Sequence, residues 1–262
     1  TIHNYETLNT RKNYYHKPQF SLRDFWTVNE RFYISNVLYA SIGNGGGTRT
    51  EGIGEIDGQV DLQTTYNSNV GAGPFGPFID SDYSDTEYKT GSYLKSSINN
   101  HFWYGALSTL NYTLSEKISI SGGLDLRYYK GEHYAEVYDL LGADYTVTND
   151  DENQRSAVKR VGDKIGYHND AIVKWGGLFS QAEYSNGMLS AFINISASNS
   201  AYKRIDYFSK KDLILSDTII EDALGTHTFN NVIVSDSINI NGKEYHLDSP
   251  EAEYSTTDWE YI

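Results

Sequence analysis

The chain has 262 residues, a formal net charge of −14 and a pI of about 4.8. This acidic balance argues against nucleic acid as a partner, because a phosphate-binding face needs clustered Lys and Arg. The absence of Cys excludes a disulfide framework and a thiolate metal site. With 23 Tyr and 23 Gly against one Met and four Pro, the composition favours strands and loops over helices.

Hydropathy argues against a helical membrane protein. The mean hydropathy is −0.55, and no apolar run approaches the length of a membrane-spanning helix. Transmembrane β-barrels differ, because their apolar residues alternate with polar ones and their loops are polar. Residues 1–4 lack the basic start and apolar core of a signal peptide, and residues 257–262 resemble the start of a strand. We therefore expect both ends to be cut from a longer chain.

The first predicted hairpin joins a strand near 15–28 to a strand near 32–43. In the first strand Phe20, Leu22, Trp26 and Val28 share one parity, which Asp24 interrupts. A long loop is predicted over 44–98, opening with the flexible glycine-rich run 43–47. This loop contains an aromatic group and an acidic group of candidate site residues: Tyr83, Tyr88 and Tyr93, and Asp80, Asp82, Asp85 and Glu87.

The central hairpin, with strands near 101–112 and 118–131, has the clearest pattern. Ile118, Ile120, Leu124, Leu126 and Tyr128 point one way, and the alternate residues Ser119, Ser121, Asp125, Arg127 and Tyr129 point the other. Each strand reaches the roughly 9–11 residues that cross a bilayer when tilted. The pattern predicts one face for lipid and one for a water-filled lumen.

A second long loop is predicted over 135–170, with a short helix at 135–141 stopped by Gly142. The third hairpin has strands near 171–184 and 188–202, and its Asn186-Gly187 pair is a strong tight-turn signal. A third long loop covers 203–255 and contains a predicted small hairpin before Asn241-Gly242. Another strand starts at 256.

Short and long connections thus alternate three times, as expected of a barrel with short periplasmic turns and long extracellular loops. Trp103, Trp175 and Trp259 each follow a long loop and are predicted to form an outer aromatic belt, with Trp26 in the inner belt. The fold class predicted is all-β, as a segment of a large antiparallel transmembrane β-barrel.

Several residues are candidates for ligand binding. The loop aromatics Tyr83, Tyr88, Tyr93 and Tyr138 are suited to stacking on sugar rings or aromatic ligands. Asp125, Arg127 and Tyr129 are predicted to face the lumen, where an ion pair explains the first two without catalysis. His101, His133 and His168 are expected near one rim.

The acidic residues Asp80, Asp82, Asp85 and Glu87 offer oxygen ligands for Ca²⁺. Their spacing does not match the twelve-residue calcium loop, so a solvated loop face is the preferred interpretation. No nucleophile-elbow motif is visible. We expect no enzymatic activity and no cofactor.

Four segments resemble the barrel of TonB-dependent outer-membrane receptors, in the Gram-negative branch that often carries a carboxypeptidase-regulatory-like domain. These segments cover residues 99–105, 121–134, 139–142 and 167–170. The resemblance implies a 22-stranded barrel with an N-terminal plug, located in the outer membrane of a Gram-negative bacterium, that imports a scarce ligand using energy from TonB. The chain resembles a central barrel segment, since it lacks a TonB box, a plug and all but about six full strands.

The resemblance implies as partners the outer-membrane bilayer, TonB through the missing N-terminal part, a small-molecule, peptide or glycan ligand, and a surface lipoprotein lid. Two alternatives remain open. One is a soluble β-sandwich that binds or hydrolyses glycans through Asp and Glu residues. The other is a surface interaction protein or adhesin. The sequence does not name the ligand, because iron chelates, vitamins, peptides and oligosaccharides all use such barrels.

Overall fold

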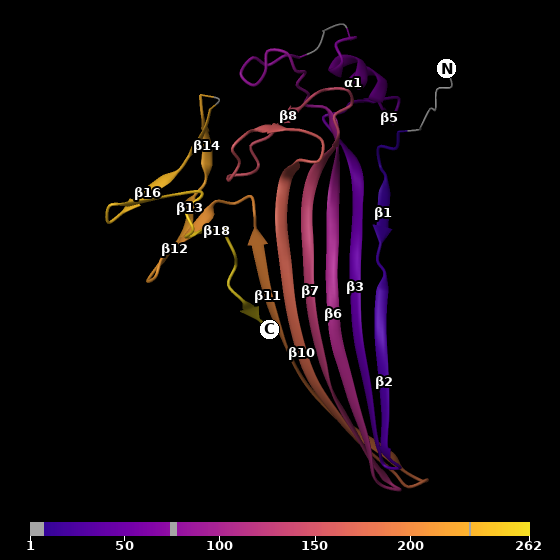
Figure 1. Ribbon diagram of the computed structural model, residues 1–262. Helices are drawn as coiled ribbons and strands as arrows, with labels where there is room; N and C mark the ends of the chain where they lie inside the picture. The colour runs from indigo at the N-terminus through magenta and orange to yellow at the C-terminus, as the bar shows by residue number, and fades with distance from the viewer. Residues whose placement is uncertain (1–7, 74–77, 231) are drawn as a thin grey trace.

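The computed structural model describes residues 8–73, 78–230 and 232–262. Three stretches lie outside these ranges: residues 1–7, where the sequence predicts no signal peptide, residues 74–77 of the first long connection, and residue 231. The chain is all-β and built on one sheet of long antiparallel strands (Figure 1). These strands are β1 (Asn13–His16), β2 (Gln19–Asn29), β3 (Phe32–Glu51), β6 (Tyr93–Ser115), β7 (Ile118–Asp139), β10 (Lys164–Ser185), β11 (Ser190–Asp206) and β19 (Glu260–Tyr261).

The strands follow one another in the sheet in chain order. Its order is β1-β3-β6-β7-β10-β11-β19, with β2 pairing the lower part of β3. In the described residues the sheet is open, with β1 and β2 at one edge and β11 with β19 at the other. The hairpins β2–β3, β6–β7 and β10–β11 are those predicted from the sequence. Their short turns gather at the lower end of Figure 1, and the long connections lie at the upper end.

The strands extend further toward the long connections than the sequence predicts. The prediction placed residues 44–51, 93–98, 135–139 and 164–170 in loops, whereas they continue β3, β6, β7 and β10. The glycine-rich run 43–47 is therefore not a flexible loop root. It is paired on both sides, so that Gly45 lies opposite Tyr15 of β1 and Asn99 of β6. A side chain at Gly45 would collide with the Tyr15 ring, so the missing side chain admits β1 to the sheet.

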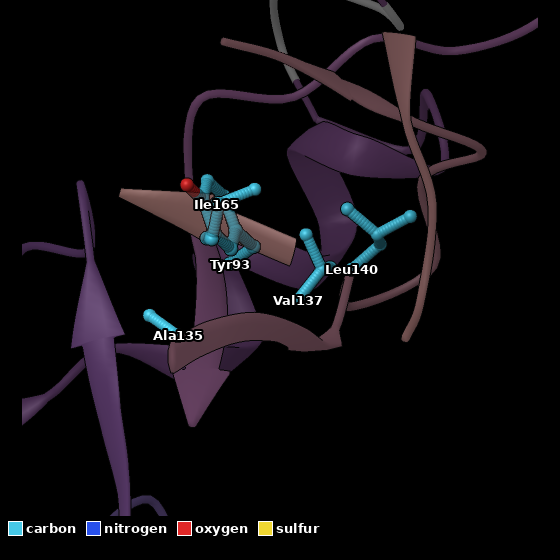
Figure 2. Close-up of a cluster of buried hydrophobic side chains, with 5 residues drawn as sticks. All are labelled: Tyr93, Ala135, Val137, Leu140 and Ile165. Carbon is cyan, nitrogen blue, oxygen red and sulfur yellow. The ribbon is translucent and has the colours of Figure 1, made fainter. Parts of the chain in front are cut away.

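The helix predicted at 135–141 is a strand as far as Asp139. Ala135 and Val137 alternate inward and are buried with Tyr93, Leu140 and Ile165 in a cluster at the upper end of the sheet (Figure 2). Burial of every second residue, Ala135 and Val137, requires the two-residue period of a strand, and this outweighs the local helix propensity of residues 135–139. Gly142, predicted as a stop, has φ of +88° at the turn that follows.

The first long connection contains a helix that the sequence did not reveal, α1 (Leu62–Asn69). The carboxylate of Asp61 caps it by accepting the Thr64 N–H at 3.0 Å. Asn69 is buried at its end, and its Nδ2 donates to the carbonyl of Leu140 at 3.0 Å. This bond fixes α1 to the end of β7. None of the described helical residues forms a span long and apolar enough to cross a membrane.

The remaining short strands belong to the long connections. The first two connections carry the pairs β4 (Glu55–Ile56) with β5 (Gln59–Val60) and β8 (Thr146–Val147) with β9 (Val158–Lys159). The third forms a small module with its own core around Leu213, Leu224 and Tyr245. The module strands are β12 (Lys211–Ile214), β13 (Ile219–Leu224), β14 (Thr226–Phe229), β15 (Val232–Ser235), β16 (Ser237–Ile240), β17 (Lys243–His246) and β18 (Ala252–Glu253).

The sequence predicted one small hairpin in the third connection, whereas the structure has two, β14–β15 and β16–β17. The residues Val232 to Val234 belong to β15, which pairs with β14. The Asn241-Gly242 pair turns between β16 and β17, with φ of +53° and +83° as the tight-turn signal requires. The strand predicted from 256 appears as an isolated bridge at Thr256 and as β19.

The register divides the main sheet into two faces. Residues directly opposite each other on neighbouring strands share a face, so Leu22, Leu38, Ala106 and Leu126 form one row. We call the face of Leu126 the apolar face and the face of Arg127 the polar face. Large aliphatic side chains on the apolar face are uncovered in the described chain: Leu22 is 67% exposed, Leu178 62% and Ile195 68%.

Aromatic rings on the polar face lie across glycines. A Cβ atom built on Gly105 would meet the Tyr39 ring, and one on Gly123 would meet the Phe179 ring. On Gly177, which is buried, the nearest atom of the Trp175 ring would be only 2.6 Å away. The glycines therefore let large rings lie along this face of the sheet.

We predict that Gly123→Ala lowers stability by about 1–3 kcal/mol, because the added carbon must displace Phe179 and approach the backbone oxygen of Ser108. The midpoint of thermal unfolding, followed by circular dichroism, measures the change. The matched control is Gly176→Ala, where the nearest atom is Leu126 Cδ2 at 3.4 Å. Equal effects of the two substitutions would contradict the packing described here.

Candidate functional site

The polar face carries a groove of about 560 Å³, which we call the aromatic groove. Its walls include Tyr15, Lys17, Trp103, Arg127, Tyr129 and Trp175. A second hollow of about 290 Å³ shares Trp103 and Arg127 with it and extends toward Tyr39 and Asp125. Ligand sites commonly have volumes of about 300–1,000 Å³ and combine apolar walls with a few polar groups.

The register of three strands builds the groove. Trp103 of β6 lies opposite Tyr129 of β7, and Trp175 of β10 lies opposite Arg127 of β7. The Arg127 guanidinium carbon lies 4.5 Å from the centre of the Trp175 ring. Trp103 meets Tyr39 edge to face, with 5.9 Å between ring centres. Adjacent strands thus present large rings and a cation to one space.

An ion pair fixes the position of Arg127. Its Nη2 lies 2.5 Å from Asp125 Oδ2, and its Nε donates to Asp125 Oδ1 at 3.2 Å. The two residues are separated by one position of β7 and so lie on the same face. Asp125, Arg127 and Tyr129, predicted to face one way, are together on the polar face, where Arg127 and Tyr129 line the aromatic groove.

His101 lines the upper end of the groove, and His133 lies next to His101. His101 Nδ1 lies 2.6 Å from the Tyr129 hydroxyl, and His133 Nδ1 lies 2.6 Å from Asn99 Oδ1. The two imidazoles meet edge to face at 6.1 Å. The third histidine expected at this rim, His168, is on the other face, because it follows the parity of Tyr134 rather than of His133.

The predicted outer aromatic belt is wrong for two of its three members. Trp103 and Trp175 lie on the polar face with Arg127, not on the apolar face. Trp259 lies over Lys174, whose Nζ is 4.3 Å from the ring centre and which belongs to the apolar face. The sequence of β6 already indicated the face of Trp103, because Trp103 alternates with Phe102, Tyr104 and Ala106, which lie on the apolar face.

The four tyrosines predicted as loop ligands do not line the aromatic groove. Tyr93 and Tyr138 lie in β6 and β7 rather than in loops, and Tyr93 is buried in the cluster of Figure 2. Tyr83 packs against Tyr145 with 6.4 Å between ring centres, and Tyr88 pairs with Ile79. These rings stabilise the folded connections, so the groove aromatics replace them as candidates.

The predicted acidic ligands do not form a metal site. Asp80 forms an ion pair with Lys89 at 2.7 Å, and this hydrogen bond lowers the pKa of the Asp80 carboxyl. Asp82 donates its backbone N–H to Asp80, and Asp85 is exposed. In the described ranges no group of three or more His, Asp or Glu side chains is arranged to hold a metal ion.

Charged residues end the apolar face below the long connections. Lys130 Nζ lies 2.9 Å from Asp170 and 3.0 Å from Glu132, and Asp170 is only 3% exposed. The hydroxyl of Tyr207 donates to Asp170 at 2.8 Å. Burial and this carboxylate together raise the pKa of Tyr207 to about 12. The buried carboxylate is therefore paired on two sides.

His168 lies above this charged group. Its Nε2 is 2.8 Å from Lys164 Nζ, and its ring stacks on Tyr207 with 4.2 Å between centres. Burial, followed by the charge of Lys164, lowers the pKa of His168 below its ordinary 6.5. A neutral imidazole accepts the ammonium hydrogen bond here, whereas a protonated one would repel it.

Comparison with family models, with curated proteins and with solved structures finds no match to this chain. A groove of rings with one fixed guanidinium is equipped to bind and orient a ligand.

We predict that stability falls as the pH drops from 7.5 toward 5.5. The folded pKa of His168 is lowered, so its stabilising contribution is present above the unfolded pKa of about 6.5 and is lost as the pH falls through the folded value. Thermal midpoints of the protein and of His168→Gln, measured across this range, test the assignment. The variant should show a flatter profile, whereas His16→Gln, at an exposed position, should not. Identical profiles for all three proteins would refute it.

Proposed function

We propose that the chain is part of a TonB-dependent outer-membrane receptor that imports a scarce ligand, such as an iron chelate, a vitamin, a peptide or an oligosaccharide. In this proposal the main sheet is a segment of a large transmembrane β-barrel in the outer membrane of a Gram-negative bacterium. The observation that carries it is a single sheet with one uncovered apolar face and one polar face.

The uncovered face favours contact with hydrocarbon. A large aliphatic side chain gains about 1.5–3 kcal/mol when it is removed from water. Leu22, Leu178 and Ile195 are each more than 60% exposed, and in the part of the chain that is described no second sheet is paired to or stacked on this face. Lipid would remove these side chains from water. The β-sandwich alternative would require a second layer instead.

Aromatic residues mark both ends of the apolar face. Tyr104 and Tyr128 stack at the upper end with 4.8 Å between ring centres, and Phe32 and Tyr112 meet near the short turns at 6.2 Å. Strand β6 runs nine residues from Tyr104 to Tyr112, which suits a tilted crossing of about 9–11 residues. Aromatic girdles at both interfaces are typical of outer-membrane barrels.

A polar row within the apolar face satisfies its own hydrogen bonds. Asp24 Oδ2 accepts from Asn36 Nδ2 at 3.3 Å, and Asn36 Oδ1 accepts from the Ser108 hydroxyl at 2.7 Å. Asp24 Oδ1 also accepts the indole N–H of Trp26 at 2.8 Å. Polar groups in a low-dielectric setting are tolerated when they are paired in this way. The row explains why Asp24 interrupts the alternation of β2.

The connections supply a direction for the proposed barrel. The short turns would lie on the periplasmic side, and the long folded connections on the extracellular side. In this arrangement the aromatic groove faces the lumen, and the third connection stands at the outer surface. A TonB contact through an N-terminal part and a surface lipoprotein lid belong to the same proposal.

Trp26 and Trp175 provide a direct test, because they lie on opposite faces. We expect bromine on lipid acyl chains to quench the fluorescence of a variant that retains only Trp26, after reconstitution of the full protein into vesicles. A variant that retains only Trp175 is the matched control and should be quenched much less.

Failure of the protein to enter vesicles, or equal quenching of the two variants, would overturn the proposed function. Quenching confined to Trp175 would reverse the assignment of the faces and contradict the proposal equally.

A further inference from the structure

The aromatic groove is unusual in its charge. The chain as a whole carries a formal charge of −14. The groove and the adjoining hollow nevertheless present two cations, Lys17 and Arg127, against one carboxylate, Asp125. This local excess of positive charge attracts an anionic group, and it does so where apolar rings surround it.

Arg127 is held in a defined orientation. Asp125 engages Nε and Nη2, and the Trp175 ring packs 4.5 Å from the guanidinium carbon. A guanidinium has five N–H donors, so donors remain beyond those that Asp125 uses. The Trp175 ring packed against the guanidinium limits its rotamer freedom before a ligand binds. A guanidinium also matches the two oxygens of a carboxylate or sulfate.

Aromatic rings line the row of residues directly above this cation on the sheet. Trp103 and Tyr129 are opposite each other in the row above Arg127, and Tyr202 lies in the same row. Lys17 Nζ is 5.4 Å from the centre of the Trp103 ring, so a second cation stands beside the rings. A flat ring of a ligand that stacked here would bring its substituents within reach of both cations.

We propose that the aromatic groove binds an anionic ligand that carries a flat-faced ring, with the ring against Trp103 and the acidic group at Arg127 and Lys17. This inference rests on the proposed function and narrows its ligand to an acidic sugar or an aromatic acid. Asp125 competes with the ligand for Arg127 and so limits its affinity.

The role of Asp125 makes the proposal testable in two directions. Binding of trigalacturonate and of its neutral counterpart α-1,4-galactotriose, and of 2-naphthoate and its neutral counterpart 2-naphthalenemethanol, is measured by calorimetry on the full protein in detergent. We expect the anionic member of at least one pair to bind more tightly than the neutral one. The pair that shows the preference identifies the source of the ring.

Two substitutions should then move the affinity in opposite senses. Arg127→Gln should weaken binding of the anion about tenfold, since a charge-assisted hydrogen bond is lost. Asp125→Asn should strengthen it several-fold, because the competing charge is removed. Lys174→Gln is the matched control, as Lys174 is next to Trp175 in sequence but on the other face, and it should leave the affinity unchanged.

No binding, equal binding of anionic and neutral members in both pairs, or weakening by Asp125→Asn would overturn the proposal. The variant that retains only Trp26 is checked in parallel for quenching by brominated lipid after reconstitution. Quenching without anion binding would leave the transporter in place and reject only the ligand class, whereas loss of quenching would reject the proposed function itself.

Discussion

The antiparallel register of β3, β6, β7 and β10 is the constraint on which the rest of the structure depends. It is continuous from Leu94 to Ser115 on β6 apart from single irregularities at the two ends, so the face of every side chain is fixed along the strand. A shift by one residue would bring Leu126 to the face of Arg127 and disperse both the apolar surface and the aromatic groove. The apolar face and the polar face therefore depend on the same backbone hydrogen bonds, and a change of register would disrupt both.

The glycines make the polar face possible. Residues such as Trp175 and Tyr39 are too large to stand in close rows on neighbouring strands, and they lie instead across Gly177 and Gly105. Glycine within a strand costs stability because it has no side chain to pack. Here a ring from a neighbouring position supplies that packing, which offsets the cost. The result is a polar surface that is also aromatic, with charge confined to a few fixed groups.

Sequence periodicity predicted the three hairpins and the two faces of β7, because Ile120, Leu124 and Leu126 alternate with polar residues without interruption. It missed the upper halves of the strands, where partners on β1 and in the folded connections decide the conformation. Residues 135–139 show this, since helix-favouring residues become a strand once Ala135 and Val137 are buried. Part of the groove was predicted. The alternation of residues along β7 gave the face of Arg127, but the tryptophans were assigned to an aromatic belt because they are close to loops in the sequence. Parity within β6 was the better guide, and the register was needed to bring Trp175 beside Arg127.

The central claim is that one sheet separates hydrocarbon from a wet interior, and a cysteine scan along β7 tests it most directly. Residues 1–262 contain no Cys, so each substitution between 118 and 129 introduces the one thiol of this segment. In native membranes, thiols at the odd positions should react with a small water-soluble maleimide, and thiols at the even positions should resist it and react with a lipid-soluble one. A reactivity with a period of two residues is the result that the account predicts. Equal reactivity of both parities toward the water-soluble reagent would contradict it.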